Sequence, residues 1–149
     1  MNYATKGIET SESSVLNVLT ELKNGQIREA VDGFAEQFKF TDYGIGLEFD
    51  DKERLTEFFQ KTRELYPDSA LMTDRILANG QNVATEWTLR YTVTEPFFGG
   101  LSRRVPVVMH GVSVVRTGNG KITRWSEYYD GLTARRTALG SYFTDWVER

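Results

Sequence analysis

The sequence predicts an α+β fold in which helices pack on one face of a curved, antiparallel or mixed sheet. Two observations carry this prediction. Apolar residues spaced at i, i+3, i+4 and i+7 recur within residues 10–66, as in amphipathic helices. From Ala70 onward the apolar residues recur with a period of two, as in strands. Helices that precede a run of strands segregate into a helical layer and a sheet.

Three amphipathic helices are predicted. The first begins at the capping pair Thr10-Ser11 and stops at Asn24-Gly25. The second is short and carries Phe34 at the end of its apolar face. The third is capped by Asp50 and ends at Pro67, which cannot continue a helix. Each helix therefore offers one face to a core and one to water.

Three strands are predicted ahead of the C-terminal hairpin. Residues Gln37–Tyr43 alternate, so that Phe38, Phe40 and Asp42 share one face, and the apolar face of this strand ends in a carboxylate. Ala70–Ala78 and Val83–Thr94 follow, separated by an Asn-Gly turn signal. The second of these is apolar on one face and polar on the other, so one face is covered and the other is wet or in contact with a partner.

The stretch Val105–Asp130 is predicted to form a β-hairpin. A nearly unbroken apolar run, Val107–Val115, meets a Gly/Asn turn cluster, and the more polar run Lys121–Tyr129 returns. Because the first strand is apolar on both faces, we expect it in the middle of a sheet that is covered on both sides. The hairpin holds the only histidine, His110, and sets Glu127 among aromatic residues.

The length of the hairpin loop decides whether these two residues share a face. With an even number of loop residues His110 lies on the face of Glu127. With an odd loop, such as Gly118-Asn119-Gly120, Gly111 takes that place and His110 turns away. The residues alone leave both arrangements open.

Length and composition exclude several classes of protein. The 149 residues, with no repeat or linker, predict one domain over 1–149, with residues 1–9 as a flexible N-terminus. A net charge of -3 gives no electrostatic drive toward nucleic acid or an anionic membrane, and neither is expected as a partner. The beginning of the chain has no apolar core segment, so neither a signal peptide nor a membrane span is expected, and the cytoplasm is the expected location.

The residue types also limit the chemistry. There is no cysteine, which excludes disulfides and thiolate chemistry and permits a reducing compartment. A single histidine excludes multi-histidine metal sites, and no calcium-type cluster of acidic residues is present. No metal and no cofactor are therefore expected.

Two segments carry a family resemblance. FAEQFKFTDYG at Phe34–Gly44 and NGKITRWSEYYD at Asn119–Asp130, in the order helix–helix–strand–helix–strands, resemble the SnoaL-like branch of the nuclear transport factor 2-like superfamily. That superfamily includes polyketide cyclases, ketosteroid isomerases and limonene epoxide hydrolases. The resemblance implies a cystatin-like α+β roll, in which the sheet wraps around the N-terminal helices and forms a cone-shaped apolar pocket. It also implies a homodimer formed through the other face of the sheet, and alignment to the family favours Gly111 in the pocket register.

Residue by residue, the match to the epoxide hydrolase branch is poor. Glu127 falls where one catalytic aspartate of those enzymes lies. Their arginine and central aspartate fall on Trp87 and Leu89, and their tyrosine and asparagine on Phe40 and Asp42. Four of these five roles are altered, so an epoxide hydrolase is the last choice among the enzymes of the family. The cyclase branch uses an aspartate with a nearby histidine, for which Glu127 and His110 are the counterparts.

The candidate catalytic residues are Glu127, Asp42 and His110, each with a plainer alternative. A carboxylate among aromatic residues is desolvated, which raises its pKa and suits Glu127 to proton transfer. The alternative is a solvated strand residue. Asp42 is a candidate base at the cavity mouth or else a turn residue before Gly44. His110 either orients Glu127 or lies at a partner interface on the opposite face.

The expected ligand-binding wall is apolar and aromatic, and comprises Phe40, Trp87, Leu89, Tyr91, Met109, Trp125 and Tyr129. Two functions follow. The first is a cofactor-independent enzyme, cyclase-like or ketosteroid isomerase-like, that moves a proton next to the carbonyl of a small apolar ligand such as a polyketide- or steroid-like ring. The second is a ligand-binding or dimerisation module of the same fold without chemistry. Phe97 and Phe98, with the aromatic tail 132–149, are expected to serve a lid or an interface.

Overall fold

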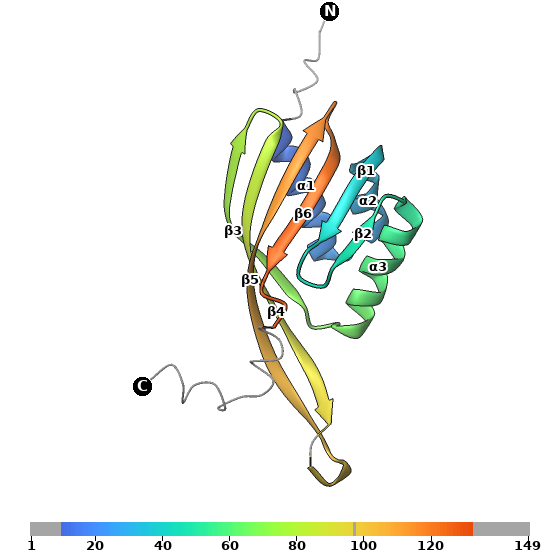
Figure 1. The fold of residues 1–149 in the computed structure, drawn as a ribbon, viewed down its shortest axis with the longest axis vertical. Coiled ribbons are helices and arrows are strands. Elements are labelled where there is room, and N and C mark those ends of the chain that lie inside the picture. The colour runs from blue at the N-terminus through green and yellow to red at the C-terminus, as the bar shows by residue number, and fades with distance from the viewer. Residues whose placement is uncertain (1–9, 97, 133–149) are drawn as a thin grey trace, which may run out of the picture.

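The fold is α+β, as the sequence predicts, and a computed structural model describes residues 10–96 and 98–132 (Figure 1). The predicted flexible segment 1–9, Phe97 and all but the start of the aromatic tail lie outside these residues. The elements, in chain order, are α1 (Ser11–Asn24), α2 (Ile27–Asp32), β1 (Phe34–Asp42), β2 (Leu47–Phe49), α3 (Lys52–Leu65), β3 (Ala70–Asn79), β4 (Asn82–Pro96), a 3₁₀ turn (Phe98–Gly100), β5 (Ser102–Gly118) and β6 (Lys121–Tyr129).

The six strands form one curved, unclosed sheet in the order β2-β1-β6-β5-β4-β3. Strands β1 and β6 pair in parallel, and every other neighbouring pair is antiparallel, so the sheet is mixed. Helix α1 crosses behind the strands in Figure 1, and α3 lies beside the β2 edge. The described helices therefore pack against one face of the sheet, which we call the concave face; the other is the convex face.

The element boundaries differ from the predicted ones where a local cap or a pairing partner decides. Helix α1 keeps its predicted ends, with the Thr10 hydroxyl accepting the Ser13 N–H and Gly25 ending the helix at φ 76°. Helix α3 is capped by Asp51, one residue after the predicted Asp50. Phe34 was wrongly placed in the second helix, because it begins β1. The short strand β2 was missed, since its three residues form a strand only by pairing with β1.

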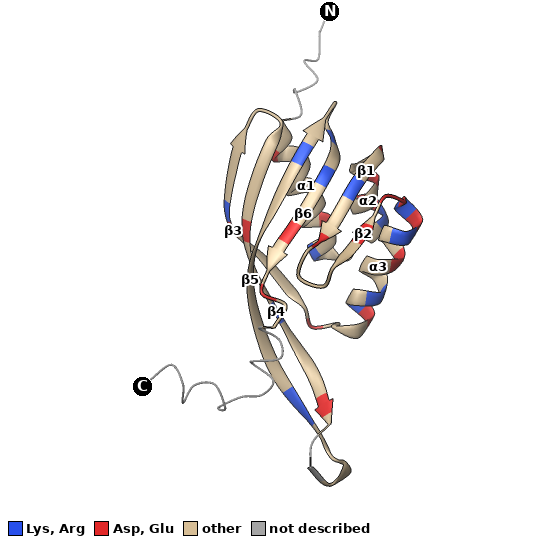
Figure 2. Ribbon diagram, in the orientation of Figure 1, with Lys and Arg blue, Asp and Glu red and all other residues tan. Residues whose placement is uncertain are grey.

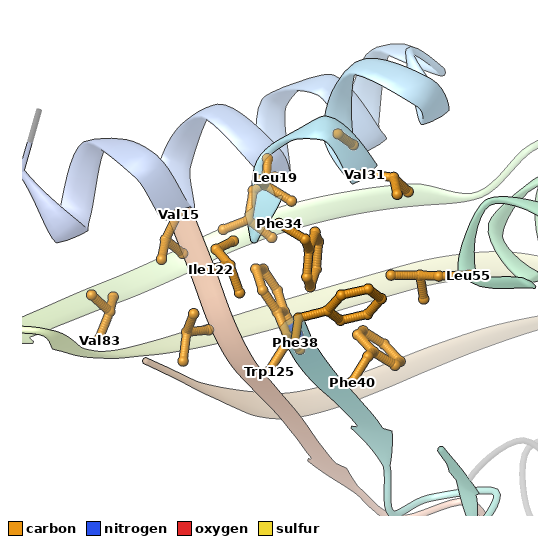
Figure 3. Packing of buried hydrophobic residues seen from close by; sticks show 13 residues of the cluster. Val15, Leu19, Val31, Phe34, Phe38, Phe40, Leu55, Val83, Ile122 and Trp125 are labelled. Carbon is orange, nitrogen blue, oxygen red and sulfur yellow. The ribbon is translucent and has the colours of Figure 1, made fainter. Parts of the chain in front are cut away.

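The core lies between α1, α2, α3 and the concave face (Figure 3). Val15 and Leu19 of α1 point toward Ile122, while Phe34 packs on Trp125 with ring centroids 6.0 Å apart. These side chains are almost fully buried, and each contributes about 1.5–3 kcal/mol through removal of apolar surface from water. The helices and the β1–β6 pair are thereby fixed relative to one another.

The β5–β6 hairpin settles which residues face the core. Its loop is the two-residue turn Asn119-Gly120, with φ of 52° and 74°, the geometry of a type I′ turn. An even loop alone would place His110 on the face of Glu127. The register shifts, however, between the pairs Thr117–Ile122 and Arg116–Arg124, which leaves Thr123 as an extra residue on β6. This bulge reverses the parity and turns His110 away.

The convex face is not covered by any described helix, so the expectation that β5 is covered on both sides is wrong for the described residues. Val114 of β5 is 46% exposed, and His110, in the middle of the strand, is also exposed. The side chains of the apolar run of β5 instead alternate between the packed concave face and the open convex face. Figure 2 shows that β5 carries no Lys, Arg, Asp or Glu along this run.

Beyond the body of the domain, β4 and β5 continue as a two-stranded arm (Figure 1). Pairing extends to Pro96 and Ser102, and the Glu95 carboxylate accepts hydrogen bonds from the Arg103 guanidinium across the arm. The segment that follows the predicted strand Val83–Thr94 therefore continues the pairing of β4 with β5 as far as Pro96 and Ser102.

Gly111 is required at its position by the indole of Trp87. A Cβ at Gly111 would lie 2.3 Å from Trp87 Cζ2, and the Trp87 side chain is 5% exposed and cannot move away. We expect Gly111→Ala to destabilise the protein by about 1–3 kcal/mol, the cost of overpacking, in chemical unfolding. Gly118→Ala is the matched control, because its Cβ would meet only Thr123 Cγ2 at 3.4 Å. Equal stability of the two variants would contradict this packing.

Candidate functional site

Glu127 lies on the concave face, at the centre of the sheet. Its Cα partners are Ser113 on β5 and Asp42 on β1, so three polar residues form a row across three adjacent strands. The pleat places Trp125 and Tyr129 on the same face, two residues before and after Glu127. Of the two interpretations that the sequence left open for Glu127, a pocket residue or a solvated strand residue, the structure places it on the helix-covered face.

The carboxyl group of Glu127 is only partly hydrogen-bonded. The Trp125 indole Nε1–H donates to Oε1 at 3.2 Å, and Oε2 accepts no hydrogen bond from the described residues. Burial, and after it the nearby Asp42 charge, raise the pKa of Glu127 to about 8 against the opposing effect of the Trp125 hydrogen bond. Glu127 keeps partial exposure as a residue because it lines a cavity. At neutral pH most of this carboxyl group is thus protonated.

Asp42 is buried beside Glu127, but its oxygens are already engaged. Oδ1 accepts the backbone N–H groups of Gly44 and Ile45 at 3.0 and 3.1 Å, and Oδ2 accepts the Tyr129 hydroxyl at 3.0 Å. This is the turn-forming role that the sequence left open beside the catalytic one. In the structure Asp42 thus holds the turn after β1 through its hydrogen bonds, and its charge raises the pKa of Glu127.

Tyr129 connects this turn to the sheet. Its ring lies against Gly44, where a Cβ would come within 2.2 Å of the ring carbon Cζ. Burial raises the pKa of Tyr129, and its hydrogen bond to Asp42 and the negative charge there raise it further. The phenol therefore stays neutral and acts as a fixed donor to Asp42.

Ser113 is a polar residue of the site that sequence reasoning missed. Its hydroxyl oxygen accepts the Trp87 indole Nε1–H at 2.9 Å, and the hydroxyl proton has no acceptor among the described residues. Ser113 is almost fully buried and lines the same cavity as Glu127. The available signal was cross-strand register: once Gly111 is placed opposite Tyr129, Ser113 must lie opposite Glu127.

A cavity of about 170 Å³ lies between α1, α3 and the concave face. Its inner end is formed by Glu127, Ser113 and Trp125 on the sheet, and its walls are mostly apolar. Its outer end is formed by exposed residues of the two helices, among them Lys23 and Arg63. The Oε2 atom of Glu127 and the hydroxyl proton of Ser113 are therefore polar groups offered to a molecule at the inner end of the cavity.

The predicted wall residues divide into three groups. Trp87, Leu89 and Trp125 line the cavity. Phe40 is instead buried in the aromatic core. The remaining predicted residues pack in a second apolar cluster around Val107, toward the arm; they are Tyr91, Met109 and Tyr129. Alternation on the strands placed all seven on the concave face, but only the packing of α1 and α3 decides which stretch of that face stays open.

His110 does not join Glu127, so its prediction as a catalytic partner is corrected. The register pairs His110 with Thr88 and places both on the convex face. The Thr88 hydroxyl lies 3.0 Å from His110 Nδ1 and donates to Asp74 Oδ2 at 2.6 Å. The physical reason is the bulge at Thr123, which reverses the side of every residue beyond it.

No group of three or more His, Cys, Asp or Glu side chains that could hold a metal occurs within residues 10–96 and 98–132. Over the same residues, no helix has both the length and the apolar character needed to cross a membrane.

Comparisons with known proteins agree with this architecture. The family model described as SnoaL-like domain matches residues 15–125. A putative polyketide cyclase, IdmH, from Streptomyces antibioticus has 19% identity and a TM-score of 0.74, covering 87% of this chain and 98% of its own. A putative SnoaL-like polyketide cyclase from Shewanella denitrificans has 12% identity and a TM-score of 0.75, covering 88% and 98%.

A protein of ketosteroid isomerase-like fold from Catenulispora acidiphila, solved in complex with trimethylamine, has 15% identity and a TM-score of 0.73, covering 87% and 95%. At these identities the solved structures show a shared fold. No curated protein matches the sequence. The family match spans most of the chain and confirms the resemblance seen in its segments: the protein belongs to the SnoaL-like domain family.

Proposed function

We propose that the cavity binds a small, largely apolar molecule with an enolisable carbonyl group, and that Glu127 transfers a proton on it without a cofactor. The observation that carries this proposal is a carboxyl group of raised pKa whose Oε2 is unpartnered at the inner end of an apolar cavity. Oε2 is not among the fully buried atoms that lack a partner, so it is open to the cavity and can meet a ligand there.

The neighbouring groups define the roles. Ser113 donates its free hydroxyl proton to the carbonyl oxygen, which stabilises the charge that develops there on enolisation. Ionised Glu127 removes a proton from the adjacent carbon, and protonated Glu127 returns it to carbon or to oxygen. Proton transfer of this kind serves either an isomerisation or an aldol-type cyclisation, the two cofactor-independent reactions expected from the family resemblance.

The size of the cavity narrows the ligand. Drug-sized ligands occupy pockets of roughly 300–1,000 Å³, whereas this cavity measures about 170 Å³. A fused polycyclic ring of the steroid kind exceeds it, so we favour a single-ring or short-chain ketone. An epoxide hydrolase stays the last choice, because Trp87 and Leu89 occupy the positions where the resemblance requires an arginine and an aspartate.

Exchange of the α-hydrogens of small ketones for deuterium, followed by NMR, tests the proton transfer without knowledge of the product. We expect the exchange rate to rise with pH through about 8 and then level off, because the base is ionised Glu127. Glu127→Gln should lower the rate by about 10²–10⁴-fold, the usual contribution of a general base.

The matched control is Glu86→Gln, which removes a carboxylate from the convex face of β4, outside the cavity. Glu86→Gln should exchange at the rate of the unchanged protein. A Glu127→Gln variant that keeps the full exchange rate would overturn the catalytic proposal and leave a binding function.

A non-catalytic association function is the second candidate, and the convex face favours it. Exposed apolar side chains lie there on β3, β5 and β6 and in the turn after β1, namely Tyr43, Met72, Leu77, Val114 and Tyr128. Tyr43 and Tyr128 stack with ring centroids 4.8 Å apart. Exposed apolar side chains on one face of a sheet are typical of an interface, and we propose that two copies of the chain pair through this face as a homodimer.

Val114→Arg tests this pairing, since it places a charge in the middle of the convex patch. We expect a dimer in sedimentation velocity for the unchanged protein and a dissociation constant about a hundredfold higher for the variant, because an unpaired charge at a buried interface costs several kcal/mol. Leu65→Arg on α3, at a site 70% exposed and away from the patch, should leave the dimer intact. A monomeric unchanged protein would exclude the homodimer.

A further inference from the structure

We propose that the ligand of the cavity carries a carboxylate at the end remote from its carbonyl group, and that Lys23 and Arg63 bind this carboxylate. The inference rests on the proposed function and deepens it, because it names the class of ligand as a small oxo acid. It follows from the distribution of charge along the cavity.

The two ends of the cavity differ in charge. Lys23, in the last turn of α1, and Arg63, in the last turn of α3, both line it. Both are exposed, whereas Ser113 and Trp125 at the other end are almost fully buried. Two cations from different helices therefore meet at the solvent end of a cavity whose walls are apolar.

These cations are not neutralised within the described protein. Neither Lys23 nor Arg63 forms an ion pair with any residue of the described ranges, although five other Lys or Arg residues do. Glu127 is the only Asp or Glu among the described residues that line the cavity, and it lies at the opposite end. An anionic group at the outer end thus meets two positive charges that form no ion pair, while Glu29 and Glu64 line the neighbouring hollow that shares Arg63.

Both residues also complement the helix ends on which they lie. The Arg63 guanidinium donates to the Leu22 carbonyl oxygen at 3.5 Å, and it crowds Gly25, where a Cβ would lie 2.7 Å from its Cζ. This contact is long and uses one of five guanidinium N–H groups, so most of the donor capacity of Arg63 is left. The planar guanidinium matches the two oxygens of a carboxylate, which is why we choose a carboxylate as the anion.

The apolar section between the two ends sets the shape of the ligand. Leu19, Leu71 and Leu89 are among the apolar residues that line the cavity, together with the helical cations and with Ser113 and Glu127 of the sheet. A ligand with polar groups at both ends and a hydrocarbon middle fits this combination of lining residues. With Glu127 protonated at neutral pH, the inner end does not repel such an anion.

Paired small molecules that differ only in charge test the inference. Single-ring and short-chain oxo acids, beginning with 4-oxocyclohexanecarboxylate, are compared with their methyl esters by NMR titration of the protein. We expect each acid that binds to do so about fivefold more tightly than its ester, the scale of an exposed ion pair. The preference should shrink at high salt, because screening weakens exposed ion pairs.

Lys23→Gln and Arg63→Gln should each reduce the preference for the acid and leave ester affinity unchanged. If Arg63→Gln fails to fold because the contact with Leu22 is lost, Arg63→Lys replaces it. This variant keeps the positive charge, so it should keep part of the preference for the acid. Matched controls are Lys61→Gln on the same helix as Arg63 and Arg116→Gln on the convex face of β5, neither of which lines the cavity. Both controls should keep the full preference.

Two outcomes separate this inference from the function on which it rests. If esters bind as tightly as acids, or if the preference survives both cavity substitutions, the carboxylate assignment is overturned while the ketone-binding proposal stands. If no acid and no ester binds, the inference and the proposed ligand class fall together.

Discussion

The register of the β5–β6 hairpin is the constraint on which the site depends. The type I′ turn Asn119-Gly120 alone would direct Glu127 and His110 to one face, and the extra residue Thr123 reverses that outcome. As a result Glu127 stands between Ser113 and Asp42 on the concave face, and Gly111 leaves room for the Trp87 indole. A single bulge thus selects which polar residues enter the helix-covered side of the sheet.

The buried carboxyl group has a thermodynamic cost whose sign follows from its raised pKa. Between about pH 4.5, the ordinary value, and about 8 the folded state holds a proton that the unfolded state has lost. In this window Glu127 lowers the free energy of unfolding as pH rises, by at most about 1.4 kcal/mol per pH unit. Below the window the group adds no penalty, and above it the penalty is complete. The buried carboxyl group therefore reduces stability at the place where we propose that it transfers a proton.

Local pattern predicted much of this structure, and long-range packing decided the rest. The ends of α1 follow from Thr10 and Gly25, and the strand alternation placed Phe40 and Asp42 on one face correctly. Strand β2 escaped prediction because three residues have no pattern apart from their pairing with β1. The family resemblance favoured Gly111 on the concave face, which is right, although the loop has two residues and not three: a bulge in β6 supplies the parity that an odd loop would have given.

Some residues of the site could likewise be predicted from local sequence, and others only from the packing. The flanking aromatic residues made Glu127 a candidate, but they left open whether its face is covered, which depends on where the helices pack. Ser113 carried no local signal, since one serine in an apolar strand has no meaning until the register is known. The packing of α1 and α3 across the sheet decides which wall residues stay open to the cavity. It also brings Lys23 and Arg63 to the cavity.

The titration of the Glu127 side-chain carboxyl carbon by NMR, assigned with Glu127→Gln, tests the central claim most directly. A midpoint near pH 8 is the result expected of a carboxyl group buried beside Asp42 at the end of an apolar cavity. A midpoint near the ordinary value of 4.5 would show a solvated carboxylate and contradict the account.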